Sequence, residues 1–232
     1  MSDTILTNNT DKFPIAWPAI KAALAAGSSP EQWESAISKC LDTRLSYRYL
    51  DPIKGIAGSR KLKGEGFLIL TIQCSLLEFL ASLRVGWNYS HGADWGDNFE
   101  YGDSKRLFLD FLRRNTPFSS FIPTKAKATI FYRDIRCGLV HEAQTKDGWV
   151  VKGGTSRYPL VDFDNKIVNR DAMGDAIDDY LANYCQALKT DQGLQEAFVR
   201  KFDNLYHNAS LAPGFSAVIQ AASDAPTKQN GL

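Results

Sequence analysis

The chain has 232 residues, of which 44% are hydrophobic and 23% charged, with 27 Lys and Arg against 26 Asp and Glu. This length suits one large domain or two small ones, and 13 Phe, 9 Tyr and 5 Trp supply the apolar area that disordered chains lack. A net charge of +1 argues against a globally basic nucleic-acid binder. Any contact with phosphate therefore has to come from a local cluster of cations.

Both ends of the chain have the composition of tails. Polar or weakly patterned residues predict a disordered tail over 1–12, a single domain over 13–211 and a flexible tail over 212–232. No apolar signal segment opens the chain, and no cysteine stands in a Cys-x-x-Cys or Cys-x-x-His pair. We therefore expect a cytoplasmic protein with free thiols, and with neither a metal site nor a cofactor.

Helical periodicity dominates the first part of the domain. Ser29-Pro30-Glu31-Gln32 is a capping signature, and apolar residues follow it at helical spacing to about Tyr49, before Pro52. Residues 54–66 are predicted to form a loop, because they contain four glycines. The four basic residues of this loop can attract an RNA backbone, although the segment lacks the ending of a P-loop.

Residues 67–87 are apolar enough to raise the question of membrane insertion, which needs about 20 mostly apolar residues. Polar side chains interrupt the run, so we expect a central buried helix and no association with a membrane. The interrupting residues are Gln73, Glu78, Ser82 and Arg84. An unpaired carboxylate is costly in such a helix, which predicts a partner for Glu78; an arginine of a later helix, a lysine and a backbone amine are all open.

The second part of the domain is also mainly helical. Residues 106–114 form a short amphipathic helix, Pro117 and Pro123 bracket a loop, and a further helix runs from Thr124 to about His141. Two β-prone runs within residues 149–163 meet at Gly153-Gly154, which favours a hairpin. Two more periodic segments follow, and the whole predicts a mostly α bundle with one inserted β-hairpin.

The helix that ends at His141 has an unusual outer face. At about 100° per residue its core stripe consists of Ala128, Phe131, Ile135 and Leu139. The far side mixes charged and apolar residues, namely Arg133, Arg136, Cys137, Val140 and His141. Gly138 beside them weakens the helix by about 1 kcal/mol relative to Ala, which is intelligible where another backbone approaches closely. The simple alternative is a partly exposed helix end whose histidine favours the helix dipole.

The segment Arg136-Cys137-Gly138-Leu139-Val140-His141 resembles the Arg-x(4–6)-His motif of the HEPN superfamily (higher eukaryotes and prokaryotes nucleotide-binding domains). The resemblance covers roughly residues 30–210 and implies a HEPN-like helical bundle with the β-hairpin inserted after the motif helix. It further implies a metal-independent endoribonuclease, in a toxin or antiphage-defence system, with RNA as substrate and Arg136 and His141 as the catalytic pair. It also implies a homodimer that shares its site, and an antitoxin or defence-system partner protein.

The chemistry of the two side chains agrees with that role. An RNA 2′-hydroxyl that attacks the adjacent phosphate needs proton transfer and positive charge on the phosphorane. Histidine transfers protons near neutral pH, and arginine presents a planar fork of donors to phosphate oxygens. Arg133, one turn earlier, is a weaker candidate for holding a neighbouring phosphate. Active members of the family commonly carry a polar residue where this chain has Cys137, so the alternative is a catalytically silent module that binds RNA, nucleotide or a protein.

Overall fold

The computed structural model describes residues 17–25, 29–59, 63–154 and 159–210, with side chains as far as Tyr206. The predicted tails over 1–12 and 212–232 lie outside the described residues. Helices dominate the described part of the chain, which confirms the mostly α class, and short strands make up the rest.

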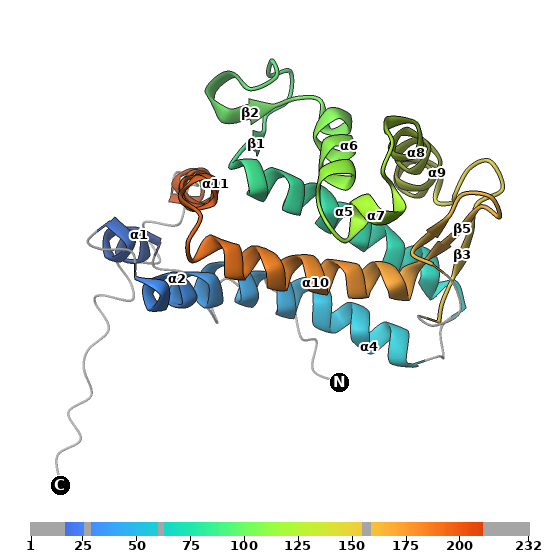
Figure 1. Ribbon diagram of the computed structural model, residues 1–232, viewed down its shortest axis with the longest axis horizontal. Helices are drawn as coiled ribbons and strands as arrows, with labels where there is room; N and C mark the ends of the chain where they lie inside the picture. Colours follow the sequence, from blue (N-terminus) through green and yellow to red (C-terminus); the bar gives the residue numbers. More distant parts are fainter. Residues whose placement is uncertain (1–16, 26–28, 60–62, 155–158, 211–232) are drawn as a thin grey trace, which may run out of the picture.

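A long helical segment forms the base of the molecule in Figure 1, next to the short helix α1 (Trp17–Ala25). Ser29 caps it as predicted, because its Oγ accepts from the Gln32 amide while the Gln32 carboxamide accepts from the Ser29 amide at 2.8 Å. The segment alternates between α-helical and wider π-helical turns: α2 (Pro30–Ile37), η1 (Ser38–Asp42), α3 (Thr43–Leu45), η2 (Ser46–Leu50) and α4 (Asp51–Ser59).

The predicted loop over 54–66 is wrong over residues 54–59, where α4 continues the helix, and over residues 65–66, where the next helix begins. Pro52 does not end the helix, and it directly follows the π-helical turns of η2. Such a wide turn departs from the regular i→i−4 hydrogen-bond ladder, in which a proline cannot donate.

Helix α5 (Glu65–Val85) is the central buried helix that the sequence predicts. It packs against α4, α6, α9, α10 and α11. Among the described helices it alone is long and apolar enough to cross a membrane by length and composition, but 56% of its most apolar window is buried inside the bundle.

The middle of the chain covers one side of α5 (Figure 1). After β1 (Asn88–Tyr89), η3 (Asp97–Phe99) and β2 (Glu100–Tyr101) comes α6 (Ser104–Arg114), whose apolar residues are buried as its pattern predicts. A short helix, α7 (Phe118–Phe121), lies between Pro117 and Pro123, where the sequence predicts only a loop.

The strands after the motif helix do not pair as predicted. The runs β3 (Val150–Lys152) and β4 (Val161–Asp162) do not contact each other across Gly153-Gly154; both pair with β5 (Ile167–Asn169), in the order β3-β5-β4. Strand β5 runs parallel to β3 and antiparallel to β4. The hairpin is therefore β4–β5, and its turn is stabilised by Asp162 Oδ1, which accepts from the amides of residues 164 and 165.

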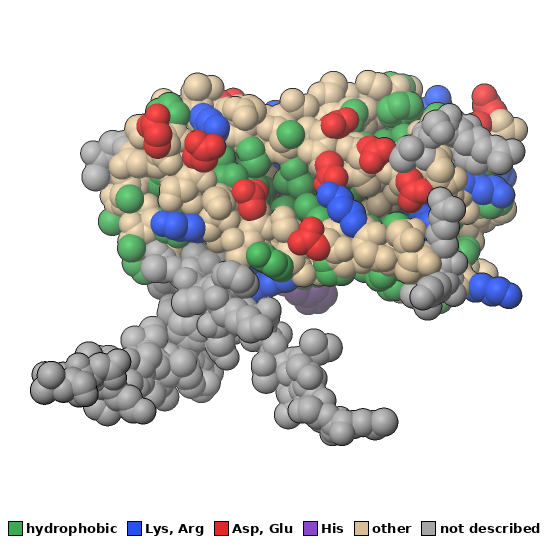
Figure 2. Space-filling model, turned by 90° about the horizontal axis from the view of Figure 1, so that it is seen from below, with side chains coloured by type: hydrophobic (Ala, Val, Ile, Leu, Met, Phe, Trp, Pro, Cys, Tyr) green, Lys and Arg blue, Asp and Glu red, His purple; other side chains and the backbone are tan. Residues whose placement is uncertain are grey.

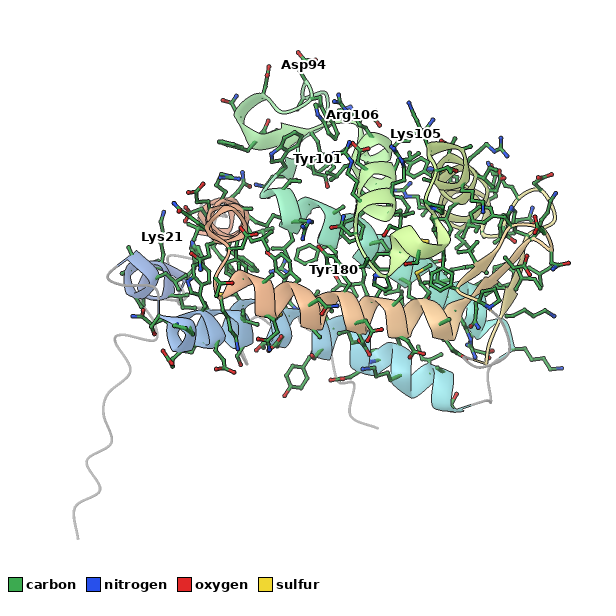
Figure 3. The ribbon with its side chains drawn as sticks, in the orientation of Figure 1. Lys21, Asp94, Tyr101, Lys105, Arg106 and Tyr180 are labelled. Atoms are coloured by element: carbon green, nitrogen blue, oxygen red, sulfur yellow. The ribbon has the colours of Figure 1, made fainter. Side chains whose placement is uncertain are left out.

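Two helices close the bundle. α10 (Arg170–Leu188) lies beside the α2–α4 segment, and α11 (Gln192–Ser210) crosses one end of the molecule next to α1 (Figure 1). Tyr180 lies on the side of α10 that faces α6 (Figure 3), where its ring packs edge-on against Phe111 with 4.9 Å between centroids.

Gly86 fixes the contact between α5 and α11. It caps α5 in the left-handed conformation, with φ 70°, and a Cβ there would lie 2.5 Å from the carbonyl oxygen of Ala197. We expect Gly86→Ala to lower the free energy of unfolding by about 2–4 kcal/mol, because it combines an unfavourable φ with a backbone clash. Gly58→Ala is the matched control, since nothing lies within 4 Å of that position in α4; it should be neutral or stabilising in urea denaturation. Equal stability of the two variants would contradict the close contact.

Candidate functional site

The motif lies on a helix built from three stretches: α8 (Lys125–Ile130), the π-helical η4 (Phe131–Arg136) and α9 (Cys137–Glu142). The Thr124 hydroxyl caps its first turn by accepting from the amide of Lys127 at 3.2 Å. The predicted core stripe is confirmed by the burial of Ala128, Phe131, Ile135 and Leu139. Its π-helical part ends at Arg136, and such turns often occur at functional sites.

Arg136 is held by an acidic and an aromatic residue. Its Nη2 donates to Glu78 Oε2 of α5 at 2.9 Å, with the side chains 18% and 19% exposed, and its guanidinium lies 5.3 Å from the centroid of the Tyr132 ring. Burial lowers the pKa of Arg136, but Tyr132 and Glu78 more than offset this and the net pKa is raised. The motif arginine is thus the partner predicted for Glu78. This pair fixes the guanidinium in one orientation while leaving other N–H donors for a ligand.

Tyr132 and Ser104 extend this site toward α6, and neither follows from the motif. The Tyr132 hydroxyl lies 3.2 Å from the Ser104 Oγ at the start of α6, and burial raises the pKa of Tyr132. Lys105 and Arg106 follow on the outer end of the same helix (Figure 3), where Arg106 stacks 4.2 Å from the centroid of Trp95. Tyr132 stands one turn before Arg136, a spacing at which helical side chains meet, and that spacing was the available sequence signal.

His141 is exposed near the end of α9. Among the described residues no hydrogen bond or ion pair involves its imidazole, so the ring is free to exchange protons with a ligand. It stands five positions after Arg136, which corresponds to about 7.5 Å along an α-helix and about 140° around it. One helix therefore does not focus both side chains on a single phosphate.

Gly138 is required by the fold of its own chain. The chain turns back after Ala143, which adopts φ 55°, and the amide of Lys146 donates to the Asp134 carbonyl at 2.7 Å. A Cβ on Gly138 would lie 2.5 Å from the carbonyl oxygen of Gln144. The expected close backbone approach at Gly138 is thus real, but the approaching backbone is this returning segment.

Arg133 is a weaker candidate for binding phosphate than an unpaired arginine, because the carboxylate of Asp134 already accepts two of its hydrogen bonds. Its Nε and Nη2 donate to the two carboxylate oxygens, the second at 2.7 Å. Asp134 is 3% exposed whereas Arg133 is 61% exposed, so the pair anchors the arginine at the surface. The pair also fixes the direction in which the remaining N–H groups of the Arg133 guanidinium point.

The cysteines, the basic segment after Pro52 and the possible metal ligands lie outside this arrangement. All four cysteines are free, as expected, and burial raises the pKa of Cys74 to about 12, which keeps it a thiol at neutral pH. In the basic segment after Pro52, Lys54 pairs with Asp178 at 2.9 Å, while residues 60–62 lie outside the described part. Within the described residues no group of three or more His, Cys, Asp or Glu could hold a metal ion.

Comparisons with protein-family models, with curated proteins and with solved structures find nothing similar to this chain. The chemistry of the motif helix and its neighbours is therefore the basis for any functional assignment.

Proposed function

We propose that this protein is a metal-independent endoribonuclease with a HEPN-like bundle. The observation that carries the proposal is the contrast between the two motif residues: Arg136 is oriented by Glu78 and Tyr132, whereas His141 is exposed and without a partner among the described residues. A fixed cation and a free proton carrier are the two components that RNA cleavage by its own 2′-hydroxyl requires.

In the proposed reaction the 2′-hydroxyl oxygen attacks the adjacent phosphorus and the bond to the 5′-oxygen of the next nucleotide breaks. His141 takes the proton of the attacking hydroxyl while water protonates the leaving oxygen, or His141 protonates the leaving oxygen while water takes the proton of the hydroxyl. Arg136 of the other chain in the proposed homodimer stabilises the charge that develops on the phosphorane oxygens, because one helix does not bring both side chains to a single phosphate. The products are a cyclic phosphate on one fragment and a 5′-hydroxyl on the other, and the chemistry requires no metal.

The direct test is incubation of the purified full chain with total RNA in EDTA, beside the His141→Ala protein. We expect cleavage by wild type that leaves cyclic phosphate ends, and a loss of about 10²–10⁴-fold in His141→Ala, the usual contribution of a general acid or base. His141→Ala should melt like wild type, because the side chain is exposed. Undiminished cleavage by this variant would remove His141 from the reaction.

A catalytically silent binding module is the second candidate. Glu78 favours it, because this carboxylate already neutralises Arg136 and competes with a phosphate for the guanidinium. The same RNA experiment separates the two candidates: a silent module retains RNA in a binding assay and leaves it intact. The proposals of a toxin or defence system and of a partner protein rest on the resemblance of the motif, whereas the cytoplasmic location stays a prediction from the sequence.

A further inference from the structure

A cavity lies on the opposite side of α5 from the motif helix, between α4, α5 and α10. Its volume is about 130 Å³. A dry protein cavity of roughly 150 Å³ holds one benzene molecule, so this one suits a ligand of similar size. The surface of its wall is mostly apolar, and its aliphatic side chains are those of Leu50, Ile53, Ala57, Ile69, Leu76 and Ile177.

Gln73 is one of the residues that line this cavity, and its side chain has an acceptor without a partner among the described residues. The residue is 1% exposed, and its Nε2 donates to the carbonyl oxygen of Arg170 at 2.8 Å. The partner is a carbonyl, so the amide nitrogen has to face it, and this fixes the orientation of the carboxamide. The Oε1 is buried and finds no hydrogen-bond partner among the described residues. A buried acceptor without a hydrogen-bond partner favours a ligand with a neutral N–H or O–H donor.

The outer rim carries an uncompensated negative charge. Asp178 pairs with Lys54 at 2.9 Å, and Asp171 lies 3.4 Å from Arg170 Nε while accepting from the Gly154 amide. Asp175 lies between them on α10 and has no ion pair or hydrogen bond within the described part. Figure 2, which views the molecule from below, shows acidic side chains interspersed with apolar ones on the face to which α4 and α10 contribute.

The surroundings of Asp175 also disfavour its charged form. Burial and then the neighbouring carboxylates of Asp178, Asp171 and Asp179 raise its pKa, with Lys54 opposing. A cation at the rim would relieve this repulsion. A metal ion is a poor fit, because no suitable group of ligands is present among the described residues and the surface of the wall is mostly apolar.

We propose that this cavity binds a small primary amine whose short aliphatic chain ends in a neutral hydrogen-bond donor. The ammonium group pairs with Asp175 at the rim, the chain lies along the aliphatic wall, and the terminal donor reaches Gln73 Oε1. A second ammonium in place of the neutral donor is excluded by the cost of burying a charge beside a single amide oxygen. This site is independent of the proposed nuclease reaction.

The test is calorimetric titration of the full chain with three ligands of equal chain length. The first is an aminopentanol with its ammonium group at one end and its hydroxyl at the other. Pentylamine lacks the hydroxyl donor, and pentanediol, with a hydroxyl at each end, lacks the positive charge. We expect aminopentanol to bind about three- to tenfold more tightly than pentylamine, and pentanediol to bind more weakly than either amine. Equal affinities of aminopentanol and pentylamine would overturn the role of Gln73, and no binding of any of them up to about 10 mM would overturn the site.

Two variants locate the ammonium group. Asp175→Asn should weaken aminopentanol binding by about fivefold or more, and should leave pentanediol binding unchanged. Asp179→Asn is the matched control, since it removes the same charge from an exposed position of α10 that does not line the cavity. Equal losses in the two variants would show attraction by the whole acidic helix and would overturn the assignment to Asp175.

Discussion

Arg136→Ala should reduce RNA cleavage by about 10²–10³-fold, the usual effect of removing one donor that stabilises a charged transition state. It should also reduce stability, because Glu78 then keeps a partly buried charge without its partner. The loss for a fully buried pair is about 3–5 kcal/mol, and the partial exposure of both side chains lowers our expectation to about 1–3 kcal/mol. Thermal unfolding and a cleavage assay in EDTA measure the two effects separately.

The double variant Glu78→Gln with Arg136→Ala separates catalysis from folding. Glutamine removes the unpaired charge while keeping the shape of the side chain, so the double variant should regain most of the lost stability. Cleavage should remain at the level of Arg136→Ala, since the cation is still missing. Recovery of cleavage together with stability would mean that Arg136 acts only through the fold, and that another group stabilises the phosphorane.

Glu78→Gln alone shows how the negative charge of Glu78 affects the action of Arg136 on RNA. The amide oxygen can still accept from Nη2, so the orientation of Arg136 is largely kept while the competing negative charge is removed. In the silent-module candidate this variant should bind RNA more tightly and still not cut it. If the protein is the proposed nuclease, Glu78→Gln should still cleave RNA, and its cleavage rate should change by less than that of Arg136→Ala.

Local patterns predicted the elements of this protein more reliably than the contacts between them. The capping box at Ser29 and the stripe of Ala128, Phe131, Ile135 and Leu139 depend on residues three or four apart, and both are confirmed. The pairing of Arg136 with Glu78 spans 58 positions. The sequence indicated that Glu78 needs a partner, but helix packing decides which of several cations reaches it.

The wrong predictions of a loop after Pro52 and of a hairpin at Gly153-Gly154 have the same physical origin. In each case packing against distant parts of the chain outweighed the preference of the local sequence. Pro52 and the glycines after it predicted a loop, yet packing on α5 keeps residues 51–59 helical. Gly153-Gly154 predicted a hairpin, yet β3 and β4 both pair with β5. A turn signal for the true hairpin was present, because Asp164-Asn165 separates two β-prone runs.

Mixing two inactive proteins tests the proposal that a homodimer shares the active site. The outer face of α9 carries Val140, 46% exposed, next to the exposed His141. A two-fold contact would cover this apolar side chain, and would bring an arginine from one chain toward a histidine from the other. The close backbone approach expected at Gly138 is made within the chain, so this glycine does not help two chains to approach. The dimer proposal therefore rests on Val140, His141 and the separation of the two motif residues.

We expect Arg136→Ala and His141→Ala proteins, each inactive alone, to regain cleavage when mixed and allowed to exchange subunits. Random exchange of equal amounts makes about half of the dimers mixed, and each mixed dimer has one cleft with both wild-type side chains, so the activity should approach a quarter of wild type. Light scattering has to show a mass near twice 25.8 kDa before and after mixing. The Val140→Asp protein is the matched control, because a buried charge at the contact should prevent both dimerisation and recovery while this exposed position leaves the fold intact. Stable mixed dimers without recovered cleavage would contradict a single shared cleft, and would mean either that each chain works alone or that both clefts need all four residues.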